Sequence, residues 1–223
     1  MTARIVECKQ GSKDWREARL GKPTASRWCD FITPTGKPAA NKARTDLLCE
    51  LVGERLTGFI AQHFATAAME RGTLLEPEAR KWYVADTNRE VRQVGFLDAG
   101  RWGCSPDGVC ADRGLEIKCP LSTNMVRLLL AEDADAAADY MLQCQAGMWI
   151  SGLPLWDLVI YSGTAGLPNR IITLRADKDM HKAFDEIVPV FCDAVDAAEN
   201  KLRAAGGGIN MRDQYAELTG EEK

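Results

Sequence analysis

The sequence lacks the features that would place a protein in or across a membrane. No apolar run approaches the ~20 residues that a membrane-spanning helix needs. The first residues of the chain contain no apolar core of the kind that a signal peptide carries. We therefore expect a cytoplasmic protein that has no membrane partner.

Histidine is scarce, and the cysteines are not spaced as they are in metal centres. Only two of the 223 residues are His, and none of the eight Cys belongs to a C-x-x-C pair. Zinc and iron–sulfur sites favour such close local spacing, so the sequence predicts neither. A reduced cytosolic chain uses Cys as a small apolar residue, and we expect most of the eight to pack in the core.

The chain also has no overall excess of positive charge. It contains 28 Lys and Arg against 32 Asp and Glu, which gives a formal net charge of −4. This balance argues against a non-specific nucleic-acid coat protein, which is normally strongly basic. The charge is uneven, however, because residues 1–45 hold ten Lys or Arg and only four acids, whereas the chain from residue 176 onward is acidic.

Hydrophobic periodicity and turn residues predict an α/β chain with a central mixed β-sheet flanked by helices. No repeat or linker divides it, so we predict a single domain over residues 1–223, with a flexible tail from about residue 206. Pro77 should either kink its helix or make it restart, and Pro189 should bend the helix that contains it. The expected helices cover residues 41–56, 66–86, 122–130, 140–150 and 177–204, and the expected strands cover residues 91–97, 109–111, 115–119, 155–161 and 170–174.

Residues 104–120 contain the most informative group of polar side chains. Asp107 stands in a Pro-Asp-Gly turn, and Glu116 and Lys118 are two residues apart in an apolar strand, so they project from the same face. A hairpin through residues 112–114 would bring Asp107 beside Glu116. Two carboxylates there form an oxygen site suited to Mg²⁺. The lysine can orient or deprotonate a water and stabilise charge that builds on a phosphate.

Each part of this pattern also has an ordinary explanation. A Glu-x-Lys sequence in a strand is commonly a surface ion pair, and Pro-Asp-Gly alone is a turn. Their combination is much rarer, with Asp107 nine positions before Glu116 and Glu116 two before Lys118. It resembles the motif of the PD-(D/E)xK nuclease superfamily, which implies a restriction-endonuclease-like core.

Four further segments resemble motifs of the YqaJ-like, or lambda-exonuclease-type, recombination exonucleases of phages. The resemblance spans most of the chain in order. It implies an alkaline exonuclease that digests one strand of linear double-stranded DNA from the 5′ end and leaves a 3′ overhang for a single-strand annealing protein. It also implies a homotrimeric ring encoded by a phage or prophage. The segments are Trp15–Ser26, Met69–Arg80, Tyr140–Trp149 and Phe184–Phe191.

The resemblance implies a role for each candidate active-site residue. It implies Mg²⁺ as cofactor, with two ions per site and Mn²⁺ as a substitute. Asp107 and Glu116 match the metal-binding carboxylates, and Lys118 matches the catalytic lysine. Glu76 matches a helix glutamate that completes the acidic cluster, and the backbone carbonyl of Ile117 matches a further metal ligand. Gln143 matches a glutamine that lies near the metals and the attacking water.

Arg19, Ser26 and Ser105 match the family's pocket for a terminal 5′-phosphate. The chemistry fits, because a guanidinium forks onto phosphate oxygens while hydroxyls donate short hydrogen bonds. Arginines and serines are also common on surfaces. The sequence leaves open whether Trp15 and Trp28 stack on bases or pack in the core. It leaves the same question open for Met69, which would act as an apolar wedge in the duplex.

The residues leave two alternatives to an exonuclease. The same PD-(D/E)xK chemistry serves endonucleases of the restriction or junction-resolving type, and cleavage of covalently closed circles would identify one. A non-catalytic DNA-binding module that retains the fold is the other alternative. The complete set of Asp107, Glu116 and Lys118 argues against that module.

Overall fold

A computed structural model describes residues 3–60 and 66–206 of the chain. The tail that the sequence predicts after residue 206 lies outside these residues. Within them, no helix has the length and apolar character needed to cross a membrane. The helices are α1 (Lys13–Arg19), the 3₁₀ helix η1 (Ala25–Asp30), α2 (Lys42–Thr57), α3 (Ala67–Thr87), α4 (Ser122–Leu130), α5 (Asp133–Ser151) and α6 (Lys178–Ala204).

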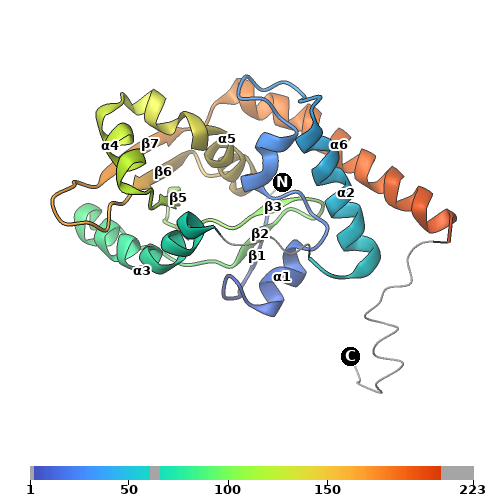
Figure 1. Cartoon of the computed structure of the whole chain (residues 1–223), viewed down its shortest axis with the longest axis horizontal. Coiled ribbons are helices and arrows are strands. Elements are labelled where there is room, and N and C mark those ends of the chain that lie inside the picture. Colours follow the sequence, from blue (N-terminus) through green and yellow to red (C-terminus); the bar gives the residue numbers. More distant parts are fainter. Residues whose placement is uncertain (1–2, 61–65, 207–223) are drawn as a thin grey trace, which may run out of the picture.

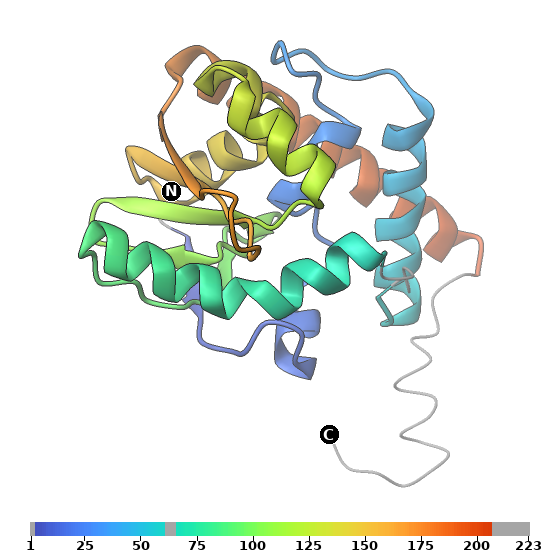
Figure 2. The ribbon, with the colours of Figure 1, turned by 60° about the vertical axis from the view of Figure 1, so that its left-hand side comes forward.

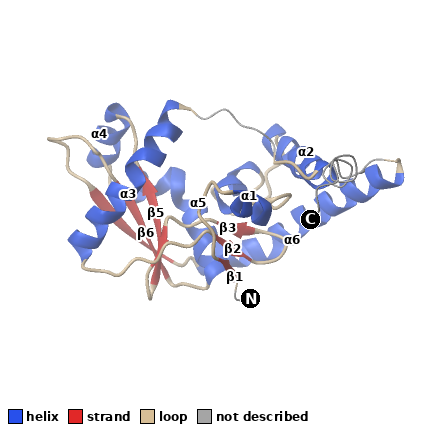
Figure 3. Ribbon diagram, turned by 90° about the horizontal axis from the view of Figure 1, so that it is seen from below, coloured by secondary structure: helices blue, strands red, loops and turns tan. Residues whose placement is uncertain are grey.

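The strands form two separate sheets, which Figure 3 shows as two groups. The smaller sheet is antiparallel, in the order β1-β2-β3. The larger has the order β4-β5-β6-β7, and only its β5–β6 pair is parallel. The mixed α/β class is therefore confirmed, with the strands divided over two sheets. The strands are β1 (Arg4–Val6), β2 (Phe96–Asp98), β3 (Gly103–Cys104), β4 (Gly108–Val109), β5 (Arg113–Lys118), β6 (Leu155–Ile160) and β7 (Arg170–Arg175).

Helices cover both faces of the larger sheet (Figures 1 and 2). On one face α3 packs its Ala79 and Tyr83 against Leu115 and Ile117 of β5. On the other face α4 and α5 pack against β6 and β7, around the buried Trp156. The alternation of β5 thus directs Leu115 and Ile117 to one side and Glu116 and Lys118 to the other, as the sequence predicts.

A third apolar cluster joins α5 to the N-terminal segment and to α2 and α6. Trp28 of η1 is fully buried and packs edge-on against Phe184 at a centroid distance of 5.0 Å. Phe31 stacks on Phe191 at 4.1 Å. Because α5 belongs to this cluster and also covers the sheet, it fixes η1 relative to β5.

The predicted helix boundaries are largely confirmed. Asn41 accepts a hydrogen bond from the Arg44 N–H and begins α2, and Thr66 caps α3 in the same way through the Met69 N–H. Pro77 lies inside α3 and Pro189 inside α6, and each helix is continuous across its proline. Since Pro77 has no N–H, the carbonyl of Thr73 lacks its usual helical partner.

The strand predicted over residues 91–97 is mostly wrong, because regular pairing covers only Phe96–Asp98 there. The carbonyl of Val94 accepts a hydrogen bond from the Gln10 side chain instead of from a neighbouring strand. At Gly95 the chain passes so close to Cys8 that a Cβ atom would lie 2.3 Å from its sulfur.

Helix α5 begins at Asp133, earlier than the predicted Tyr140. Its first turns are rich in alanine, which favours helix without giving an amphipathic pattern. Asp133 and Asp135 in the first turn suit the helix dipole. The short strands β1 and β3 were not predicted at all.

The eight cysteines are all free, as expected of a reduced chain. Five of them are buried, and all five belong to the three apolar clusters. The interpretation of most cysteines as small apolar residues is therefore confirmed.

The indole of Trp156 lies between two glycines, and this close packing sets the distance from α5 to β5. A Cβ atom at Gly114 of β5 would come within 2.2 Å of the ring, and one at Gly147 of α5 within 2.4 Å. Any side chain at either position would push helix and strand apart.

We predict that Gly147→Ala destabilises the fold, although alanine is the better helix former. Overpacking against Trp156 should lower the free energy of unfolding by about 1–3 kcal/mol, measured by urea denaturation. Gly53→Ala in α2 is the matched control, since nothing lies within 4 Å of its Cβ position. It should raise the same quantity by about 0.5–1 kcal/mol. Equal effects of the two substitutions would contradict the packing argument.

Candidate active site

The β4–β5 hairpin places Asp107 beside β5, as the sequence predicts. The Asp107 N–H donates to the Leu115 carbonyl at 3.0 Å, and Cys110 and Arg113 close the turn. Oδ2 of Asp107 accepts a hydrogen bond from the Ile117 N–H at 2.6 Å. The Asp107 carboxylate is thus held at the edge of β5, next to the residue that follows Glu116.

Glu116, Lys118 and Gln143 form a closed triangle on the α5 side of β5. The Lys118 Nζ lies 2.7 Å from Glu116 Oε1 and donates to Gln143 Oε1 at 3.2 Å. The Gln143 Nε2 donates to Glu116 Oε1 at 2.7 Å. Tyr140, one turn earlier on α5, lies under the ammonium at 5.3 Å from its ring centroid. The predicted catalytic lysine and glutamine therefore meet at Glu116.

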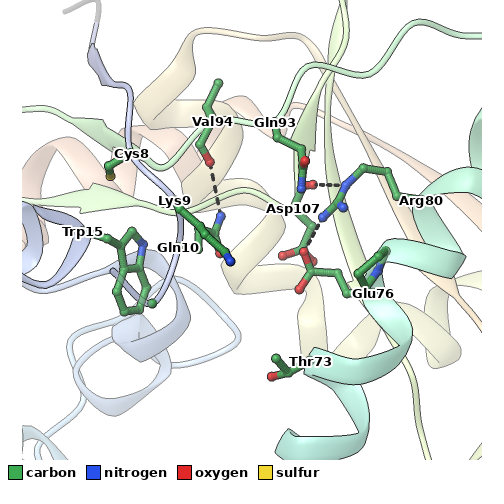
Figure 4. A pocket seen from close by; sticks show the side chains of 12 residues that line it. Cys8, Lys9, Gln10, Trp15, Thr73, Glu76, Arg80, Gln93, Val94 and Asp107 are labelled. Atoms are coloured by element: carbon green, nitrogen blue, oxygen red, sulfur yellow. Dashed lines mark hydrogen bonds and ion pairs between the residues drawn. The ribbon is translucent and has the colours of Figure 1, made fainter. Parts of the chain in front are cut away.

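Glu76 approaches the same region from α3. Its carboxylate points toward that of Asp107, and both line a cavity of about 500 Å³ (Figure 4). Arg80, one turn later on α3, forms an ion pair with Glu76 Oε1 and donates through Nε to the Asp107 carbonyl at 2.9 Å. The predicted metal ligands thus come from three elements. Glu76 lies on α3, Glu116 and the Ile117 carbonyl on β5, and Asp107 in the turn that leads into β4.

The oxygen donors suit a hard cation such as Mg²⁺. Asp107 has lost most of its water, and the charges of Glu116 and Glu76 add to this effect, so the pKa of the Asp107 carboxyl lies well above its usual range. The N–H and C=O of one strand residue point to the same side, so the Ile117 carbonyl faces Asp107 as well. A divalent cation would relieve the repulsion among these groups.

The donors are nevertheless not drawn together into a finished metal centre. Among the residues that the structure describes, no three His, Cys, Asp or Glu side chains are close enough to form one. Glu76 is held by Arg80, and Glu116 by Lys118 and Gln143. The donor set fits Mg²⁺ in its chemistry, and binding requires Glu76 and Glu116 to share their present partners with the cation.

Lys118 is held in its charged form. Burial acts to lower its pKa, but the adjacent Glu116 and the nearby Asp107 outweigh this effect, so the pKa lies above the usual range for lysine. In this state Lys118 is a hydrogen-bond donor and a positive charge.

A second group of predicted residues forms a polar corner around Arg19, between α1, η1 and β3. Arg19 donates to Ser105 Oγ at 3.2 Å, and its guanidinium stacks on the Trp15 ring at 4.1 Å. The Trp15 Nε1 donates to the same hydroxyl at 2.8 Å. Arg19 makes no ion pair with any carboxylate among the described residues. Burial lowers its pKa to about 10, against the opposing effect of Glu54, so the group remains a cation at neutral pH.

Ser26 joins this corner indirectly. Arg19 donates to Thr24 Oγ1 at 3.4 Å, and that hydroxyl lies 3.5 Å from Ser26 Oγ. Arg19, Thr24, Ser26 and Ser105 line one small cavity together with Glu116 and Gln143. The predicted phosphate-binding residues and two predicted catalytic residues therefore share a single pocket.

Several residues of the site were not predicted as functional. Thr24 lies within the Trp15–Ser26 motif, two positions before Ser26. The spacing of these two hydroxyl residues could have indicated that Thr24 lies near the predicted phosphate pocket. Arg80 ends the Met69–Arg80 motif, where an acid and a base four residues apart indicate a helical pair. Gln10 gave no sequence signal.

The three apolar residues left open by the sequence differ in position. Trp28 is a core residue with no exposed surface. Trp15 is half-buried and stacks on Arg19. Met69 is 57% exposed near the start of α3, so its position is compatible with a contact outside the fold.

We predict that Asp107→Asn stabilises the protein in the absence of divalent cations. A neutral amide can still accept from the Ile117 N–H, and it removes one of three mutually repelling charges. The melting temperature in EDTA should rise by about 2–4 °C, the shift that 1 kcal/mol produces in a chain of this size. Adding Mg²⁺ should then raise the melting temperature of the wild type but not that of the variant, by differential scanning fluorimetry. A lower melting temperature for Asp107→Asn in EDTA would contradict the account of its raised pKa.

Comparison with known proteins places these features in a family. The sequence profile described as YqaJ-like viral recombinase domain matches residues 14–154, a range that contains every predicted site residue. No curated protein matches the chain.

Solved structures resemble most of the fold. The alkaline exonuclease LHK-Exo from Laribacter hongkongensis has a TM-score of 0.77 at 29% identity, over 87% of this chain and 98% of that chain. The structure of LHK-Exo in complex with dAMP covers the same shares, with a TM-score of 0.76 at 30% identity. A phage related exonuclease from Haemophilus somnus 129PT has a TM-score of 0.67 at 14% identity, over 81% of this chain and 96% of that chain, and shows a likeness of fold alone.

The match to an alkaline exonuclease over nearly its full length supports a nuclease that acts as a hydrolase. With the profile match over more than half of its residues, the chain belongs to the family of the YqaJ-like viral recombinase domain.

Proposed function

We propose that this protein is a Mg²⁺-dependent exonuclease that digests one strand of linear double-stranded DNA in the 5′-to-3′ direction. One observation carries the proposal: Arg19, Ser105 and Ser26 line the same pocket as Glu116 and Gln143. A terminal 5′-phosphate held by Arg19 would lie at a fixed short distance from the group that hydrolyses the next phosphodiester. An endonuclease has no need of such a grip next to its catalytic residues.

The roles of the chain's own residues follow from their contacts. Lys118 is a fixed cation that can donate to a phosphate oxygen as negative charge builds there. Gln143 accepts from Lys118 and donates to Glu116, so its amide is locked in one orientation and can position the attacking water. Bound Mg²⁺, held by Asp107, Glu116, the Ile117 carbonyl and Glu76, would supply an activated water and neutralise charge on the phosphate.

The resemblance supports the wider setting of the proposal. Duplex digestion leaves a 3′ single strand, which a single-strand annealing protein can use for recombination in a phage-infected bacterial cytoplasm. A homotrimeric ring around the DNA would prevent lateral dissociation and make digestion processive. The match to LHK-Exo bound to dAMP, a deoxynucleoside monophosphate, is consistent with release of mononucleotides.

The direct test is digestion of a linear duplex whose two strands carry different labels at each end. We expect loss of the 5′ ends as mononucleotides, survival of the complementary strand, and no reaction in EDTA. Lys118→Ala should abolish hydrolysis and leave DNA binding largely intact. Cleavage of a covalently closed circle would support an endonuclease instead, and digestion by Lys118→Ala at the wild-type rate would overturn the assignment of the site.

We also predict that Arg19 provides the preference for a phosphorylated end. A hydrogen bond to a charged group contributes about 1.5–3 kcal/mol, so Arg19→Ala should reduce the ratio of rates on 5′-phosphate and 5′-hydroxyl duplexes by roughly 10–100-fold. Arg19→Lys keeps the charge but loses the fork, and should recover only part of the ratio.

Arg16→Ala is the matched control for Arg19, because Arg16 is exposed on the same helix α1. It should leave the ratio unchanged. Measuring both substrates on one variant cancels any loss of folded protein. Equal losses on both substrates for Arg19→Ala would remove Arg19 from the phosphate pocket.

A further inference from the structure

Arg80 connects two parts of the acidic cluster that come from different segments of the chain. Its guanidinium pairs with Glu76 on its own helix and donates through Nε to the backbone carbonyl of Asp107 at 2.9 Å. The side chain is only 11% exposed. One rigid planar group thus sets the position of α3 relative to the turn that carries Asp107.

The same turn is held from the other wall of the cavity. The Gln10 Nε2 donates to the carbonyl of Pro106 at 2.9 Å and to that of Val94 at 3.3 Å. Figure 4 shows Gln10 and Arg80 on opposite sides of Asp107. The two peptides that flank Asp107 are therefore each held by a side-chain donor, the preceding one by Gln10 and the following one by Arg80. Of these two donors, Arg80 is the one that also reaches a carboxylate.

Arg80 occupies one oxygen of Glu76, which it would share with a cation, and no oxygen of the Asp107 carboxylate. It bonds the backbone carbonyl of Asp107 and leaves the carboxylate to the Ile117 N–H. On Glu76 it takes Oε1, and Oε2 accepts no hydrogen bond from the described residues. Partners of this kind orient metal-binding carboxylates in many proteins, and their loss typically weakens metal binding by about 10–100-fold.

We propose that Arg80 is a positioning residue that orients Glu76 and Asp107 for a divalent cation, an inference that rests on the metal site of the proposed function. A simple charge effect has the opposite sign. Removing a positive charge from beside three carboxylates would by itself make cation binding tighter. The direction of the change therefore separates orientation from electrostatics.

The test measures cation binding directly, with Ca²⁺ as a probe that takes oxygen ligands. Isothermal titration without DNA would compare the wild type with Arg80→Gln, Arg80→Lys and Lys81→Gln. Lys81 is the adjacent residue of α3 and is exposed, so Lys81→Gln removes the same charge outside the site. Thermal unfolding in EDTA would show whether each variant is folded, and the Mg²⁺ concentration for half-maximal digestion would give a second readout.

We expect Arg80→Gln to weaken Ca²⁺ binding by roughly 10–100-fold and to raise the Mg²⁺ requirement by a similar factor. Arg80→Lys should bind Ca²⁺ nearly as weakly as Arg80→Gln, because an ammonium lacks the planar geometry of the guanidinium. Lys81→Gln should bind Ca²⁺ like the wild type. The ratio of rates on 5′-phosphate and 5′-hydroxyl ends should not change in any Arg80 variant.

Two results would overturn the inference while leaving the proposed function in place. One is equal or tighter Ca²⁺ binding by Arg80→Gln, and the other is full wild-type binding by Arg80→Lys. A wild-type protein that binds no Ca²⁺ and digests DNA in EDTA would instead refute the metal site itself. If Arg80→Gln fails to fold, Arg80→Lys provides the comparison at unchanged net charge.

Discussion

The close approach of Asp107, Glu116 and Glu76 is the constraint on which the rest of the site depends. Like charges in a poorly hydrated place repel strongly, and the raised pKa of the Asp107 carboxyl reflects that repulsion. Each carboxylate is therefore held by a donor from a rigid element. The donors are the Ile117 N–H, the Lys118–Gln143 pair and Arg80. These donors keep the acids together only as long as α3, β5 and α5 keep their spacing.

That spacing comes from the apolar clusters on the two faces of the larger sheet. On the α3 face, Ala79 and Tyr83 pack on β5 and bring Glu76 toward Asp107. On the other face, the close contact of Gly147 with Trp156 brings α5 near enough for Gln143 to reach Glu116. Since α5 also packs against η1, the Gly147–Trp156 contact also places Thr24 and Ser26 beside Glu116 and Gln143 in one pocket. The position of the polar corner around Arg19 is thus a consequence of helix packing on the sheet.

Residues whose chemistry is encoded locally could be predicted from the sequence. The Pro-Asp-Gly turn and the Glu-x-Lys strand gave the hairpin, the shared face of Glu116 and Lys118, and the side on which Leu115 and Ile117 are buried. The capping residue Asn41 gave the start of α2, and the apolar pattern gave the start of α3. The strands β1 and β3 could not be predicted, because each is two or three residues long and is defined by its partner in β2. The roles of Gln10 and Arg80 depend on contacts with residues 27 to 96 positions away, and the local sequence does not encode those distances.

The arrangement of charge explains how a protein with a net charge of −4 could act on DNA as we propose. Three of the cations at the site differ in their partners. Arg19 faces hydroxyls rather than carboxylates, whereas Lys118 and Arg80 are each paired with an acid. Of these three, only Arg19 keeps its charge available for a phosphate in the absence of a divalent cation. The carboxylates of Asp107, Glu116 and Glu76 would repel a phosphodiester until a cation neutralised their negative charge. Under the proposed function, a DNA end would therefore be held at Arg19 before the carboxylates accept the bond to be cut. Local pairing of charges, more than the net charge, would govern how that substrate approaches.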